Sequence, residues 1–162
     1  MPMTILERLR ALPKSQWMTS PPADPESLEA LESKYDLQLP ADYRELMLET
    51  NGCGLYGHAT QLNLEPPDEL LWHSEDPRFT EHLPGMFVIG DDNGDALFYY
   101  DPANRLGKGA YAIFQVDFGT IGFPYSKHAA NSLTDLFEAI LDDKAIWEYP
   151  YLGPLNHPDR AG

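Results

Sequence analysis

The sequence predicts an α+β domain, in which an antiparallel, hairpin-rich sheet packs against N-terminal helices and one C-terminal amphipathic helix. Apolar residues recur at helical spacing near both ends of the chain. Between them, residues 86–116 contain short β-branched and aromatic runs separated by turn residues. The chain has 162 residues, which suits one domain with its own core. We place that domain at residues 1–148 and a Pro- and Gly-containing tail at 149–162.

Three helices are expected in the N-terminal third of the chain. Each begins at a residue that commonly opens helices, either a side-chain N-cap or a proline that presets φ. These starts are Thr4 with Glu7 as a capping box, Asp24 before Pro25, and Pro40. Pro13 should end the first helix, and Asn51-Gly52 should end the third because both residues tolerate left-handed backbone. We expect a connector at 13–23 and a glycine-rich loop at 52–57.

The middle of the chain changes from helical periodicity to strand patterns. We expect strands at 59–64, 86–89, 96–100 and 110–116, and a short helix at 68–72 within a Pro- and acid-rich segment at 65–84. Asp92-Asn93-Gly94-Asp95 is a hairpin turn signal, because Asn-Gly accepts positive φ at both positions. Residues 101–109 form a second turn.

The last helix has the clearest amphipathic pattern in the sequence. Asn131-Ser132 provides its cap, with Asp135 at the third helical position. Its apolar positions follow at intervals of three and four residues, namely Leu133, Leu136, Phe137, Ile140 and Leu141. Such a face requires a surface to cover, and the predicted sheet supplies one.

Charge restricts the classes of partner. The chain carries 26 acidic and 11 basic residues, for a net charge of −15 at pH 7. Nucleic acid and anionic membrane surfaces would both repel it, whereas a basic protein would be attracted. With one cysteine, no signal-peptide pattern and no apolar run of membrane-spanning length, the sequence predicts a soluble cytoplasmic protein, monomeric or weakly dimeric.

The sequence contains no convincing catalytic or cofactor motif. Cys53 follows a helix end, whereas reactive thiols favour helix N-termini or cationic neighbours, so we interpret it as structural. The five histidines are scattered, and Gly107 to Ala112 precedes a strand where a dinucleotide fingerprint would follow one. The three tryptophans are expected in core or rim packing. We therefore expect no cofactor, no metal and no enzymatic activity.

The acidic cluster Asp91-Asp92-Asn93-Gly94-Asp95 has two interpretations. Oxygen ligands at 91, 93 and 95 resemble the start of a calcium loop. The sixth and twelfth positions of that loop would be Ala96 and Pro102, which lack the required glycine and glutamate. A plain acidic hairpin tip is the simpler interpretation.

Leu31 to Leu46 resembles the signature of the SUKH superfamily, with an acidic helix, Leu39-Pro40, an aromatic at Tyr43, and Asn51-Gly52 downstream. Phe87 to Asp101 is similar to the central hairpin of that family, and Ala130 to Leu133 to the start of its closing helix. The resemblance spans roughly 24–143. The superfamily includes the yeast cell-wall assembly regulator and bacterial toxin-immunity proteins.

The resemblance implies a binding module, and we expect an immunity protein that occludes the active site of a basic toxin, such as a nuclease. Carboxylates in turns and at the start of the 65–84 segment are the candidate partner-binding residues, since a polyanion complements a phosphate-binding cleft. They are Asp91, Asp92, Asp95, Asp101, Asp117, Glu65, Asp68 and Glu69. Two alternatives stay open. One is a regulatory scaffold for endogenous proteins, and the other is a hydrolase with a carboxylate cluster.

Overall fold

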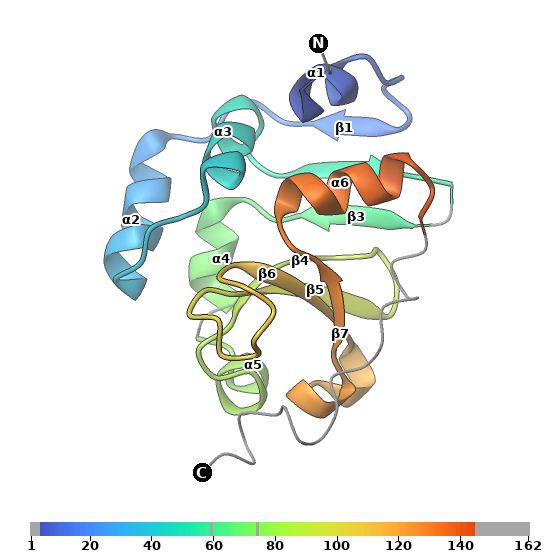
Figure 1. The fold of residues 1–162 in the computed structure, drawn as a ribbon. Coiled ribbons are helices and arrows are strands. Elements are labelled where there is room, and N and C mark those ends of the chain that lie inside the picture. Colours follow the sequence, from blue (N-terminus) through green and yellow to red (C-terminus); the bar gives the residue numbers. More distant parts are fainter. Residues whose placement is uncertain (1–3, 59, 74, 145–162) are drawn as a thin grey trace.

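The computed structural model describes residues 4–58, 60–73 and 75–144, and it confirms the α+β class (Figure 1). Within these residues the helices are α1 (Ile5–Arg10), α2 (Pro25–Tyr35), α3 (Ala41–Glu49), α4 (Pro67–His73), α5 (Pro77–His82) and α6 (Leu133–Leu141). The strands are β1 (Trp17–Thr19), β2 (Cys53–Tyr56), β3 (Gln61–Leu64), β4 (Phe87–Asp91), β5 (Ala96–Asp101), β6 (Ala112–Asp117) and β7 (Lys127–Ala130). Two 3₁₀ turns, η1 (Phe118–Thr120) and η2 (Phe123–Tyr125), join β6 to β7.

The sheet is an antiparallel meander in which each strand pairs with the next along the chain, from β1 to β7. The strands expected at 59–64, 86–89, 96–100 and 110–116 correspond to β3, β4, β5 and β6, and the short helix expected at 68–72 is α4. The segment that we expected to be a connector, 13–23, contains β1, and the expected glycine-rich loop at 52–57 contains β2. Each of these two predictions therefore missed a strand. Helix α5 and strand β7 were not expected from the sequence.

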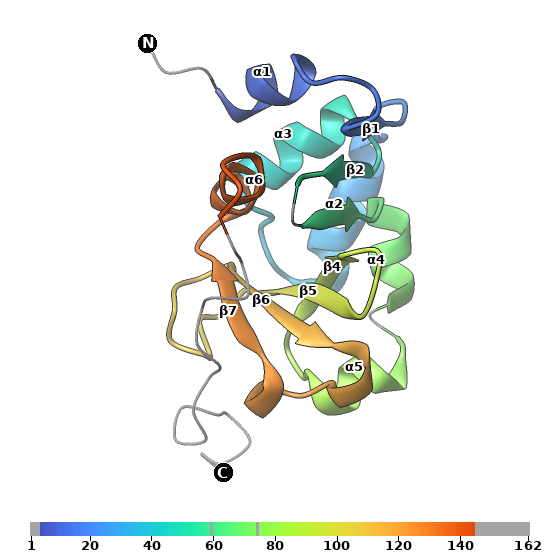
Figure 2. The same ribbon diagram turned by 90° about the vertical axis from the view of Figure 1, so that its right-hand side faces the viewer.

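The central strands are buried on both faces because each face has its own core. Alternate residues of β5 take part in the two clusters: Phe98 and Tyr100 pack with the helical core, while Leu97 and Tyr99 pack on the opposite face. In Figure 2, α1, α3 and α6 lie together above β4–β7 and α5 lies below them. All six β5 residues are therefore buried, which explains why β5 shows no polar–apolar alternation.

The expected side-chain N-caps are confirmed, but α3 ends at Glu49 with an extended Thr50 as its C-cap, before the Asn51-Gly52 cap that we expected. Thr4 and Glu7 form a capping box at α1, Asp24 accepts a bond from the Glu26 amide, and Ser132 accepts one from the Asp135 amide. These bonds satisfy amides that a helix N-terminus leaves without an internal partner. The last cap sets α6 so that its apolar face covers β7 and packs on α3.

Among the tryptophans, Trp17 is buried and meets the Phe137 ring edge-on at a centroid distance of 6.0 Å, as expected for core packing. Trp147, the predicted tail at 149–162 and the side chain of Trp72 lie outside the described part of the structure. In the described part of the chain, no helix is both long and apolar enough to span a bilayer.

Candidate functional site

The tip of the β4–β5 hairpin is built by its own carboxylates. Asp91 Oδ1 accepts bonds from the Asn93 amide at 2.7 Å and from Asn63 Nδ2 at 3.1 Å. Asp92 Oδ1 accepts bonds from the amides of Gly94 and Ala96, both at 3.0 Å. Aspartate commonly closes turns in this way, by bonding to backbone two residues ahead. Both carboxylates remain partly exposed, so their charge still faces solvent.

The backbone of this turn differs in one respect from the prediction. Asn93 adopts a φ of 61°, but Gly94 does not enter the left-handed region. The Asp92 amide donates to the Ala96 carbonyl at 3.1 Å, which closes a tip longer than the two-residue loop that Asn-Gly predicts. The longer tip exposes Asp95 at its end.

Asp117 joins the tip through strand pairing. It lies opposite Ala96 in the β5–β6 ladder, and the next amide, of Phe118, donates to the Asp95 carbonyl at 2.7 Å. Asp95 and Asp117 are both exposed. The structure thus gathers four of the predicted carboxylates at one end of the sheet. We call Asp91, Asp92, Asp95 and Asp117 the acidic tip.

An exposed aromatic side chain that was not expected from the sequence lies beside the acidic tip. Phe118 follows Asp117 directly in η1 and is 41% exposed. Tyr125, in η2, is 55% exposed. Exposed aromatic rings next to charges are frequent anchors in protein interfaces. One feature of the sequence could have indicated it. Phe118 directly follows the last residue of a strand, where side chains no longer alternate between the two faces of the sheet.

Three predicted carboxylates lie elsewhere. The Glu65 amide donates to the Ile89 carbonyl at 3.0 Å, beside the middle of β4 and away from the acidic tip. Asp68 and Glu69 follow in the first turn of α4 and are exposed. The chain leads from β3 through Glu65 toward α4, which packs on β4 and α2. The eight predicted residues therefore do not form one surface.

Asp101 was wrongly expected to be exposed. Its side chain is fully buried, and its carboxylate accepts bonds from the Arg105 amide at 3.0 Å and the Leu106 amide at 2.8 Å. Its carbonyl oxygen also accepts a bond from the Tyr111 amide at 2.7 Å. Asp101 organises the β5–β6 loop from the inside, so we withdraw it from the partner-binding set.

A large groove lies on another part of the surface. It has a volume of about 1010 Å³ and is bounded by the α2–α3 linker, by α5 with the residues that follow it, and by the β5–β6 loop. Its lining is mainly apolar and aromatic, including Tyr35, Leu37, Leu83, Met86, Val88 and Tyr111. We call this hollow the α5 groove. Its walls come from segments far apart in the sequence, so no local pattern could have revealed it.

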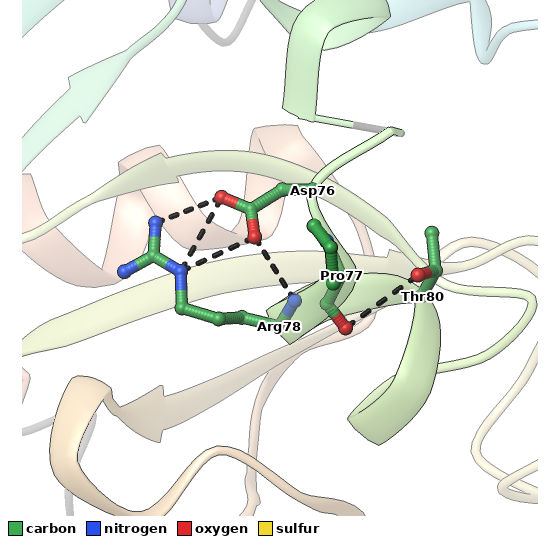
Figure 3. Close-up of polar contacts among 4 residues, drawn as sticks. All are labelled: Asp76, Pro77, Arg78 and Thr80. Atoms are coloured by element: carbon green, nitrogen blue, oxygen red, sulfur yellow. Dashed lines mark hydrogen bonds and ion pairs between the residues drawn. The ribbon is translucent and has the colours of Figure 1, made fainter.

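One wall of the groove depends on the start of α5. Asp76 Oδ1 accepts a bond from the Arg78 amide at 2.9 Å, and Oδ2 accepts one from Arg78 Nη2 at 2.8 Å (Figure 3). This cap holds a helix of only six residues, which places Phe79 in the core and Thr80 at the groove. The hydroxyl of Tyr111 donates to the Gln38 carbonyl at 2.5 Å and ties the opposite walls together.

No group of three or more His, Cys, Asp or Glu residues suited to a metal ion occurs among the described residues. At the acidic tip, the Asp91 and Asp92 oxygens bond to turn amides. These bonds favour the hairpin interpretation over the calcium-loop interpretation.

Cys53 lies at the start of β2, opposite Leu64. Burial raises the pKa of its thiol, and a hydrogen bond with the Leu64 backbone lowers that pKa only in part. Since the thiolate is the reactive form, iodoacetamide at pH 8 should modify native Cys53 at least about 10-fold more slowly than the denatured chain. Mass spectrometry of timed samples measures both rates. Equal rates would contradict a structural role for this cysteine.

Comparison with family models matched residues 22–139 to the SMI1 / KNR4 family (SUKH-1), over well more than half of the chain. Comparison with curated proteins found no significant match. The matched segment contains α2 to α6 except the last residues of α6, and it includes the acidic tip and the α5 groove. The family includes toxin-immunity proteins, and its domain is generally of a non-catalytic type. The chain belongs to the SMI1 / KNR4 family (SUKH-1).

Proposed function

We propose that this chain is a non-catalytic immunity protein that binds a cognate basic toxin, a nuclease, and occludes its active site in the cytoplasm. The observation that carries the proposal is the acidic tip, where four carboxylates and the exposed Phe118 share one end of the sheet. The family supports it, because its members include proteins that bind toxins.

The acidic tip has the chemistry that this inhibition requires. A nuclease cleft presents cationic side chains to a phosphodiester backbone, and carboxylates on a projecting hairpin can occupy the same positions. The net charge of −15 would also steer a basic partner toward the chain over distances of about a Debye length. Phe118 adds an apolar contact that is desolvated on binding.

The experiment reverses Asp95 and Asp117 to lysine and measures binding to the toxin encoded by the neighbouring gene. We expect the association rate at low salt to fall about 10-fold or more, because steering depends on local charge. The salt dependence should weaken in parallel. Stopped-flow kinetics and growth rescue in co-expression measure the two effects.

A matched control reverses Glu29 and Glu45, which are exposed on α2 and α3 away from the acidic tip. The control changes the net charge by the same amount, so an equal loss would show that only total charge matters and would reject the acidic tip as the contact surface. If the unmodified chain neither binds this toxin nor rescues growth, the immunity function is wrong. A stable set of endogenous partners from cells without toxin genes would then favour the scaffold alternative.

A further inference from the structure

We propose that the α5 groove receives a segment of the same toxin that carries two or three apolar side chains beside a basic residue. This inference rests on the proposed function and adds a second contact surface to it. The acidic tip would govern how fast the toxin is captured, and the groove would govern how long it is held.

The shape and lining of the groove favour apolar side chains. Its volume of about 1010 Å³ lies at the upper end of the range of about 300–1,000 Å³ that is common for ligand sites. Half-buried Leu37, Met86 and Val88 contribute apolar surface that stays open to solvent in the isolated chain. Filling such a hollow removes this apolar surface from water, which favours binding.

The walls are held in place before any partner binds. Phe79 and Leu83 attach α5 to the core on the far face of the sheet. The Asp76 carboxylate caps the same helix, and the Tyr111 hydroxyl bonds the α2–α3 linker to the β5–β6 loop. A preformed groove loses little conformational freedom on binding, so more of the contact energy appears as affinity.

Three cations near the groove already have carboxylate partners. Lys34 pairs with Glu75 at 2.8 Å, Arg44 with Glu32 at 2.5 Å, and Arg78 with Asp76 at 2.8 Å. A fourth, Arg105, donates from Nη1 to the carbonyl of Pro84, which lines the groove. The three ion pairs reduce the attraction of the rim for an acidic segment of a partner.

Carboxylates at the groove are available to a partner. Asp36 lines the groove, is exposed, and has no ion pair with any other described residue. Asp68 and Glu69 are exposed on α4, whose Leu70 also lines the groove. This charge distribution complements a basic residue that flanks an apolar segment.

The test fills the groove without removing a core side chain. Ala103 is exposed in the β5–β6 loop and lines the groove, so Ala103→Trp should block entry of an apolar segment. We expect the dissociation rate of the toxin complex to rise about 10-fold or more while the association rate changes less than about 3-fold, since short-range contacts form after encounter. Asp36→Asn, which keeps a residue tolerant of its φ of 49°, should lower affinity by a smaller factor.

Controls separate this inference from the proposed function. Ala30→Trp adds the same side chain on an exposed position of α2 that does not line the groove, and it should leave both rates unchanged. Thr80→Trp fills the groove from α5 and replaces Ala103→Trp if circular dichroism shows that the first variant is unfolded.

If the unmodified chain binds the toxin, and groove-filling variants dissociate like Ala30→Trp, the groove proposal is overturned while the immunity function stands. Failure of the unmodified chain to bind this toxin would reject the function itself, and the groove proposal with it. If Ala103→Trp instead converts a dimer of the isolated chain to a monomer in analytical ultracentrifugation, with toxin kinetics unchanged, the groove serves a second copy and the proposal is wrong.

Discussion

Replacing Gly90 by alanine is expected to destabilise the chain by about 3 kcal/mol or more, because the added methyl has no room. A Cβ at Gly90 would lie 1.9 Å from the Asn63 carbonyl oxygen on the neighbouring strand. That atom belongs to backbone, so a rotamer change cannot relieve the overlap. The β3–β4 ladder pairs at only Asn63–Asp91 and Leu64–Gly90, and it would have to separate.

Urea unfolding followed by circular dichroism measures this loss of stability, with the m-value as a check on two-state behaviour. Gly119→Ala is the matched control, since a Cβ at this position would have no atom within 4 Å other than those of its own residue and its two chain neighbours. We expect the control to change the free energy of unfolding by no more than about 1 kcal/mol, in either direction. Similar values for the two variants would show that β3 and β4 do not approach as closely at Gly90 as described.

Separation of β3 from β4 would also alter the acidic tip. The Asn63 side chain donates to Asp91, and the Asn93 side chain donates to Gln61, so two bonds from the tip reach β3. Loss of these bonds leaves the tip attached through its own hairpin and through its pairing with β6. Gly90→Ala molecules that remain folded should therefore bind the toxin more weakly than the unmodified chain, because their acidic tip has lost its bonds to β3.

The fold class was predictable because its strongest signals are local. The α6 pattern and the Asp92–Asp95 turn each occupy a few consecutive residues, and neither depends on a distant partner. By contrast, β2 contains Gly54, a poor strand former, and was expected as a loop. Gly54 lies opposite Met18 of β1 and Asn63 of β3, so its strand conformation is held by pairing with both neighbouring strands. Strands of this kind form through tertiary contacts that no local pattern records.

The candidate site was predictable only in part, for the same reason. The acidic tip follows from the DDNGD turn, because aspartate and asparagine bond to their own turn amides. Phe118 joins it through a hydrogen bond to Asp95, across the β5–β6 pairing. The walls of the α5 groove come from three segments that are separate in the sequence, so no local pattern predicts the groove. Asp101 resembles the other turn carboxylates in sequence, and only its burial distinguishes it.

Asp101→Ala should therefore cost far more stability than loss of any acidic-tip carboxylate. The carboxylate accepts the Arg105 and Leu106 amides at 3.0 and 2.8 Å, and Leu106 is buried, so water cannot readily replace both bonds. We expect a loss of about 2–4 kcal/mol, since an unsatisfied buried amide and a lost charged acceptor both contribute. Asp101→Asn keeps one acceptor oxygen and should fall between the alanine variant and the unmodified chain.

Asp95→Ala provides the comparison, because Asp95 is an exposed residue of the same hairpin and its change should stay within about 0.5 kcal/mol. The two variants should also differ in function. Asp95→Ala should slow toxin association with little effect on stability, whereas Asp101→Ala should loosen the β5–β6 loop, which carries Pro102 and Ala103 at the α5 groove. Amide exchange of residues 102–109, measured by mass spectrometry, should accelerate in Asp101→Ala alone. Unchanged exchange and stability would mean that this buried carboxylate does not hold the loop, and the wall of the groove would need another support.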